Sequence, residues 1–184
     1  MRSRSLILGA VLLLGLAGCD KKDKAAEAAL PPVDFVEQPA ASAGGACILW
    51  DYAFIEQKIG VKFSVAAADQ VDDTSTCVVQ TVNGDWPDLA LSVVESTQAD
   101  ADLFLSDLKP EKATKLKGLG KAAYRLNTAA TGAHGPTVEI GWLSEAEQLQ
   151  TLRFTFAQNA KSDAVTQLST SLVSLAKAMD TTDG

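Results

Sequence analysis

The chain has 184 residues and a formal net charge of −7 at pH 7, from 23 acidic and 16 basic residues. Because nucleic-acid binding requires clustered lysine and arginine, this balance argues against nucleic acid as a partner. Hydrophobic residues make up 47% of the chain, which is enough for a packed core.

The N-terminus has the parts of a secretory signal peptide. Arg2 and Arg4 precede an uncharged apolar run over residues 6–16, and small residues follow the run. The run is too short to span a bilayer, which needs about 20 apolar residues. The leader therefore predicts export.

The leader ends in Leu16-Ala17-Gly18-Cys19, which resembles the lipobox of bacterial lipoproteins. The resemblance implies a diacylglyceryl group on the Cys19 thiol, cleavage before Cys19 and often acylation of the new amine. We therefore expect lipid on Cys19 to hold the chain on the extracytoplasmic side of a cell membrane, since two or more acyl chains anchor stably. The alternative is an ordinary secretory peptide that has a cysteine nearby.

Asp20 comes directly after this cysteine and resembles the signal that retains proteobacterial lipoproteins in the inner membrane. In a host with two membranes it predicts the inner one, with the domain in the periplasm. Lys21 at the next position weakens this signal, because neighbouring residues modify it. In a host with one membrane, the domain would face the cell wall.

These signals divide the chain into three parts. Residues 1–18 are a lipoprotein signal peptide, residues 19–45 a lipidated flexible tether, and residues 46–184 a single α+β domain. The tether assignment rests on charged residues, prolines and small residues that show neither helical nor strand periodicity.

Two cysteines, Cys47 and Cys77, remain in the domain once Cys19 is assigned to lipid. An even pair in an exported domain favours a disulfide, with two free buried thiols as the alternative. A metal site is less favoured, because His134 is the only histidine and no third thiol is left.

A helix is expected at the start of the domain, ending at Gly60. Its apolar residues recur at helical spacing: Ile48, Leu49, Tyr52, Ile55 and Ile59. Residues 61–66 can then form a strand, ahead of an acidic turn at residues 69–75.

A hairpin follows, in which residues 76–82 and 88–94 are the strands and residues 83–87 the turn. The first strand is rich in β-branched residues. In the second, Leu89, Leu91 and Val93 alternate on one face.

A second helix is expected from a Thr97 cap to Leu108, with Leu105 and Leu108 facing inward. Pro110 breaks it, and a weaker helix is predicted over residues 111–116.

The last third of the domain predicts a second hairpin and a final helix. Residues 121–126 suit a strand or a helix, whereas apolar residues alternate over 138–142 and 152–156 around a connection at 143–148. Ser162 is expected to cap the clearest helix of the chain. Its apolar stripe consists of Val165, Leu168, Leu172, Leu175 and Met179.

This order of elements predicts an α+β fold, with an antiparallel sheet of two or more hairpins and helices packed on one face. In this layout, Cys47 lies at the start of a helix, Cys77 in a strand, and the short run Gly118–Ala123 before a strand-like stretch. The layout resembles that of small actinobacterial lipoproteins of unknown function. These are similar to the extracytoplasmic sensor domain of mycobacterial serine/threonine kinases. The resemblance implies a domain used for binding or sensing.

Few residues form a pattern of catalytic or ligand-binding type. His134 could serve as a base, but no Gly-x-Ser-x-Gly elbow accompanies it, and a solvated loop histidine is favoured. A calcium site is not expected at Asp69, Asp72 and Asp73, because they lack the spacing of an EF-hand. A solvated turn is favoured there. Gly118-Leu119-Gly120 is too short for a nucleotide fingerprint and reads as a tight turn.

Two further sets of residues could bind a polyanion or a ligand. The basic segment between Lys109 and Arg125 could contact anionic headgroups or another polyanion, although a solvated surface is favoured. Its members are Lys109, Lys112, Lys115, Lys117, Lys121 and Arg125. Of the three tryptophans, Trp50 and Trp142 are expected in the core, and Trp86 is the most exposed.

The sequence therefore predicts a membrane-anchored envelope lipoprotein whose domain binds or senses an unknown envelope protein or small ligand, without catalysis and without a cofactor. A structural role in an envelope assembly is the alternative, followed by a hydrolase that uses scattered carboxylates.

Overall fold

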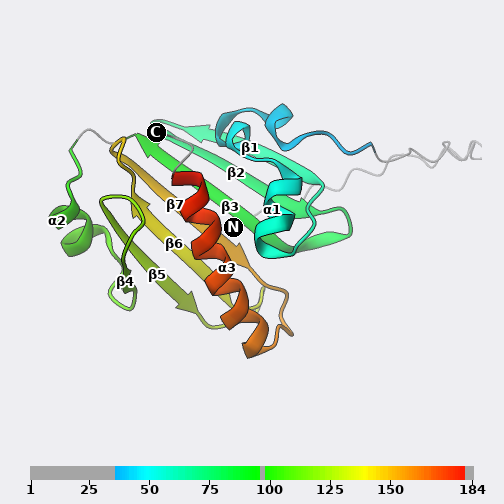
Figure 1. The fold of residues 1–184 in the computed structure, drawn as a ribbon. Helices are drawn as coiled ribbons and strands as arrows, with labels where there is room; N and C mark the ends of the chain where they lie inside the picture. Colours follow the sequence, from blue (N-terminus) through cyan, green and yellow to red (C-terminus); the bar gives the residue numbers. More distant parts are fainter. Residues whose placement is uncertain (1–35, 96–97, 181–184) are drawn as a thin grey trace, which may run out of the picture. The chain divides into compact units, whose positions relative to one another are not determined.

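The computed structural model describes residues 36–95 and 98–180, so the lipobox-like residues, Cys19 and Asp20 all lie outside the described part. Seven strands form one antiparallel sheet in the order β1-β2-β3-β7-β6-β5-β4 (Figure 1). The predicted α+β class with an antiparallel sheet is confirmed.

The sheet consists of two meanders joined side by side. The elements in chain order are η1 (Ala40–Ala43), η2 (Gly45–Leu49), α1 (Tyr52–Ile59), β1 (Val65–Val71), β2 (Thr74–Thr81), β3 (Gly84–Glu95), α2 (Ala101–Leu103), η3 (Phe104–Leu108), β4 (Thr114–Leu116), β5 (Ala122–Thr128), β6 (Thr137–Leu143), β7 (Gln148–Thr155) and α3 (Ser162–Asp180). Strand β3 ends the first meander and β7 ends the second. Their antiparallel pairing, from Asp88 opposite Thr155 to Glu95 opposite Gln148, makes the sheet continuous. Both predicted hairpins, β2–β3 and β6–β7, are confirmed.

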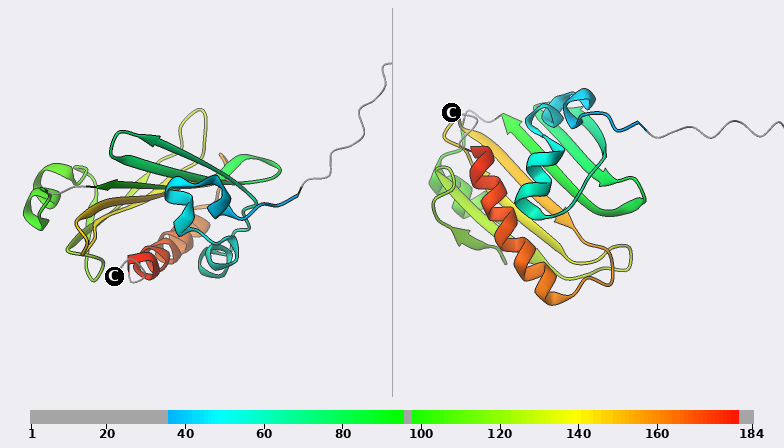
Figure 2. Two further views of the ribbon diagram at one scale, coloured as in Figure 1. Left: turned by 90° about the horizontal axis from the view of Figure 1, so that it is seen from above. Right: turned by 45° about the vertical axis from the view of Figure 1, so that its right-hand side comes forward.

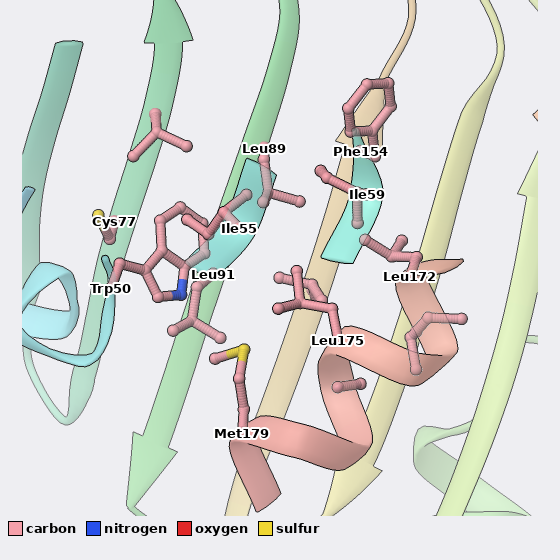
Figure 3. Packing of buried hydrophobic residues seen from close by; sticks show 14 of the residues in the cluster. Trp50, Ile55, Ile59, Cys77, Leu89, Leu91, Phe154, Leu172, Leu175 and Met179 are labelled. Carbon is pink, nitrogen blue, oxygen red and sulfur yellow. The ribbon is translucent and has the colours of Figure 1, made fainter. Parts of the chain in front are cut away.

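Helices α1 and α3 cover one face of the sheet (Figure 1, Figure 2). Alternate strand residues point into the layer between sheet and helices, where side chains from α1, α3 and the strands meet (Figure 3). The predicted final helix is present as α3, which includes Ser162, the residue predicted to cap it, as its first residue. Four of the five residues in its predicted stripe are buried: Leu168, Leu172, Leu175 and Met179. This layer is the main hydrophobic core.

A short helical segment, α2 followed by the π-helical turn η3, packs on the opposite face. There Phe104 stacks on Tyr124 with ring centroids 5.8 Å apart. Of the two residues predicted among the inward ones, Leu105 packs against this cluster, whereas the prediction for Leu108 was wrong, since it is 45% exposed. Phe104, at 3% exposed, is the buried residue of this turn. The helical cap is also Asp100 rather than Thr97, since the Asp100 carboxylate accepts the Leu103 N–H at 2.8 Å.

The folded part begins ahead of the boundary expected at residue 46. Residues 40–43 form η1, and Ala40 is only 1% exposed because η1 packs against η2 and β1. The predicted tether therefore extends too far: its last residues belong to the domain.

Two helical predictions were wrong in detail. The first helix does not include Ile48 and Leu49, which lie in η2 and are exposed, because Trp50 and Asp51 are extended and Asp51 caps α1 by accepting the Phe54 N–H at 2.8 Å. Residues 111–116 are not a helix, since Thr114–Leu116 pairs with β5 as an edge strand. Within residues 36–95 and 98–180, every helix falls short of the length and apolarity needed to traverse a bilayer.

Candidate functional site

A cavity of about 440 Å³ lies between α1, α3 and the adjoining ends of β3 and β7; we call it the α1–α3 cavity. Small-molecule sites in proteins have volumes of about 300–1,000 Å³ and mostly apolar walls. The walls here are largely apolar: Ile59, Val61, Pro87, Phe154, Phe156, Ala157, Ala160, Ala164 and Leu168. The cavity thus has the size and the surface of a ligand site.

Gly60 shapes the α1 side of the cavity. Its φ of 74° is in the left-handed region, which glycine adopts without steric cost, and its N–H donates to the Glu56 carbonyl at 2.7 Å. The turn ends α1 directly after Ile59, so Ile59 and Val61 on either side of it both line the cavity. The sequence-based expectation that Gly60 stops the helix is confirmed.

Buried aromatic and aliphatic side chains form the floor. Phe154 and Phe156 meet edge to face with ring centroids 4.7 Å apart, and they are 1% and 9% exposed. Leu168 of α3 is 6% exposed beside them. Alanines at positions 157, 160 and 164 line the α3 side, where larger side chains would fill the space.

The polar side chains that line the cavity are Gln167 and Ser171, both on α3. They are four residues apart, so they lie one turn apart on the same side of the helix. Gln167 is exposed and Ser171 half-buried. The cavity therefore has an apolar floor and an uncharged polar edge.

The predicted disulfide is present between Cys47 of η2 and Cys77 of β2, with Cα atoms 4.9 Å apart. Both residues are fully buried. The bridge fixes the N-terminal segment onto the sheet.

A second group of functional interest surrounds Asp88, on the sheet face opposite α1 and α3. Burial raises the pKa of Asp88, while hydrogen bonding to Thr155 and the nearby Arg153 and His134 act in the opposite direction. One carboxylate oxygen, Oδ1, is buried without a hydrogen-bond partner. Register pairing places Asp88 directly opposite Thr155 on β7.

His134 lies in the loop between β5 and β6, as predicted, but it is half-buried rather than solvated. Its Nδ1 is 2.7 Å from the Gly135 carbonyl oxygen, and its ring lies 5.5 Å from that of Trp86. Trp50 and Trp142 are 4% and 0% exposed and Trp86 is half-buried, which confirms the predicted order of exposure.

Tyr124 makes a buried polar contact that the sequence did not predict. Its hydroxyl donates to Glu139 Oε1 at 2.9 Å, while the ring stacks on Phe104. Burial, with the charge of Glu139, raises the pKa of Tyr124. The one sequence feature that could have indicated this contact is the alternation of side chains along β5, which places Tyr124 on the face opposite Ala123.

The basic segment does not form a single surface. Lys109 donates to the carbonyls of Pro110 and Ala113, and Lys121 pairs with Glu147 at 3.0 Å. Lys115 pairs in register with Tyr124, whose neighbour Arg125 points to the other face of the sheet. Lys115 and Arg125 therefore lie on opposite faces of the sheet, and Lys109 and Lys121 are occupied by contacts within the domain.

Most of the remaining candidate residues lie in turns. Asp72 and Asp73 form the β1–β2 turn, and Asp69 lies in β1. In the part of the chain that the structure describes, no three His, Cys, Asp or Glu side chains gather as metal ligands. Gly118 and Gly120 have φ values of 70° and 49°, as the tight-turn interpretation requires.

The chain matches no protein-family model, no curated protein and no solved structure. The α1–α3 cavity is therefore the candidate functional site of the domain. Sequence reasoning placed Leu168 and Phe154 in the core but did not bring them to one cavity with Gln167 and Ser171. No spacing along the chain links α1, β7 and α3, so no sequence signal could have done so.

Proposed function

We propose that this chain is an envelope lipoprotein, anchored through Cys19, whose domain binds a small apolar molecule in the α1–α3 cavity. The anchor rests on Leu16-Ala17-Gly18-Cys19 after an uninterrupted apolar run. The binding function rests on the cavity itself, which is the observation that carries the proposal.

Apolar burial supplies the affinity in this proposal. The floor of Phe154, Phe156 and Leu168 is fixed by the core beneath it, so a ligand would meet a largely preformed surface. Transfer of apolar surface out of water stabilises a complex by about 25 cal/mol per Å² before the costs of association.

The lining favours binding over catalysis. Its polar side chains are those of Gln167 and Ser171, and neither an acid nor a base stands beside the Ser171 hydroxyl in the cavity. Nucleophilic catalysis by a hydroxyl requires a base within hydrogen-bond reach. The half-buried Asp88 and His134, which a hydrolase would use, are not among the lining residues.

Filling the cavity tests the proposal. The mature chain (residues 19–184, with Cys19→Ser so that no lipid is attached) is titrated with N-phenyl-1-naphthylamine, an uncharged dye that fluoresces in apolar sites. Ala164→Leu places a larger side chain in the cavity without lowering helix propensity much, and should weaken dye binding by about tenfold or more.

Thr170→Leu is the matched control, because it puts the same side chain on an exposed position of α3 outside the cavity. It should leave dye binding unchanged. Equal dye binding by both variants, each folded by circular dichroism, would show that the cavity is not the site.

One observation favours assembly as a second candidate function. Ile48 and Leu49 of η2 are 67% and 39% exposed, and they border a second hollow of about 310 Å³ with Val93 and Ala146. Exposed apolar side chains grouped in this way mark protein interfaces. Under this candidate, a photo-reactive residue at position 48, but not one at exposed Gln57, would form a discrete adduct in intact cells.

A further inference from the structure

We propose that the ligand of the α1–α3 cavity is an uncharged amphiphile: one apolar chain with a single alcohol, ester or amide group held by Gln167 and Ser171. This inference rests on the proposed binding function and adds the chemical class of the ligand. Three features carry it: the apolar floor, the polar pair at the edge, and the lack of a charged side chain among the described residues that line the cavity.

The floor selects the apolar part. The side chains of Phe154 and Leu168, which line the floor, are apolar and offer no hydrogen-bond partner to a ligand. A polar or charged end placed there would lose its hydration without compensation. A volume of about 440 Å³ lies within the range of small-molecule sites and suits a ligand with a medium-length chain.

The edge of the cavity determines which polar group a ligand can carry. Within the described residues, neither the Gln167 side chain nor the Ser171 side chain makes a hydrogen bond, so both side chains can bind a ligand. The Gln167 amide donates and accepts, and so does the Ser171 hydroxyl. Spaced one helical turn apart, the two can hold one small group that donates, accepts or does both.

The absence of charge from the lining sets the preference for an uncharged head. Lys62 and Lys161 are sequence neighbours of Val61 and Ala160, but both are exposed and neither lines the cavity. A carboxylate bound against Gln167 and Ser171 would give up part of its hydration without meeting a cation. An alcohol of the same chain length would exchange water for neutral hydrogen bonds at little cost.

Competition against the dye tests the class of ligand. The mature chain carrying Cys19→Ser is loaded with N-phenyl-1-naphthylamine at pH 8 and titrated with 1-decanol or with decanoate. The two share a ten-carbon chain and differ in the charge of the head. Decanol should displace the dye with an apparent Kd lower than that of decanoate by about tenfold.

Removal of the polar pair provides the second measurement. The double variant Gln167→Leu, Ser171→Ala should bind decanol about fivefold more weakly and keep its affinity for the dye, which needs no hydrogen bond. Both positions lie at the edge of the cavity, so the fold is retained. Gln57→Leu, on the exposed face of α1, is the control for added apolar surface.

The outcomes separate the inference from the proposed function. If the dye binds but decanol and decanoate compete equally, or if the double variant keeps full affinity for decanol, the inference is wrong and the binding function stands. If the dye binds neither the parent chain nor the control variant, the proposed function itself fails.

Discussion

Asp88 is an ionisable side chain placed where its charge is disfavoured. It lies in β3 on the face opposite α1 and α3, half-buried, with Oδ1 unpaired. Burial outweighs the contributions of Thr155, Arg153 and His134, so the pKa of the folded state lies above the ordinary value of 3.8. A residue of this kind makes stability depend on pH.

The sign of that dependence follows from linkage. Between pH 3.8 and the raised pKa, the folded state binds more protons at Asp88 than the unfolded state, so the free energy of unfolding falls as pH rises through this window and then levels off. Asp88→Asn removes the ionisation and keeps an amide that can still bond to Thr155. The variant should therefore lack the fall in stability over this window and gain on the parent chain as pH rises.

Urea unfolding followed by tryptophan fluorescence between pH 3 and 8 measures this effect. Asp107→Asn is the matched control, because Asp107 is exposed at the end of η3. A pH profile of Asp88→Asn that runs parallel to those of the parent and the control would contradict the assignment of a raised pKa.

At the scale of elements, patterns that are long or repeated predicted the structure well. The α3 stripe from Leu168 to Met179 spans several turns, so a period near 3.6 is unambiguous and the helix is present where predicted. The two hairpins were predictable for the same reason, since alternation in β3 and β7 separates two faces clearly.

Short segments were predicted less well, because tertiary contacts decide them. Thr114–Leu116 is a strand since it can pair with β5, although its own composition suits a helix. The exposed Ile48 and Leu49 continue the helical spacing of α1, but the disulfide holds this segment in a 3₁₀ turn against β2. The α1–α3 cavity could not be predicted at all, because it is made by residues that only the fold brings together.

The disulfide is the covalent link between the N-terminal elements and the sheet, and its removal should be costly. Cys47→Ala with Cys77→Ala opens a loop of 30 residues, and on the chain-entropy model this lowers the free energy of unfolding by about 3–4 kcal/mol. Urea unfolding of the double variant and of the parent chain measures the difference.

Reduced parent chain is the control, because it loses the bridge and keeps both sulfur atoms in the core. The reduced chain and the double variant should be destabilised by similar amounts, the variant slightly more because alanine packs less well. Stability unchanged by reduction would show that the bridge does not constrain the unfolded chain.

At the scale of the whole molecule, the folded domain begins closer to the proposed lipid site than the sequence suggested. Sixteen residues lie between Cys19 and Val36, the first described residue. A chain of this length spans at most about 60 Å when fully extended. If Cys19 carries lipid as proposed, we therefore expect the domain to lie within this distance of the membrane surface.

The same proposal predicts where the protein is found in a host with two membranes. Wild-type protein should take up radiolabelled fatty acid and fractionate with the inner membrane, because lipid on Cys19 anchors it and Asp20 resembles a retention signal. Cys19→Ala should abolish the label and leave the chain uncleaved or soluble. Asp20→Ser keeps the lipid and removes the carboxylate beside the acylated amine, so it should keep the label and shift protein toward the outer-membrane fraction on a density gradient.

Lys21→Ser is the control for a changed charge at the neighbouring position. Full labelling of Cys19→Ala would refute lipidation, whereas labelled wild-type protein in the outer membrane, unmoved by Asp20→Ser, would refute the sorting role alone.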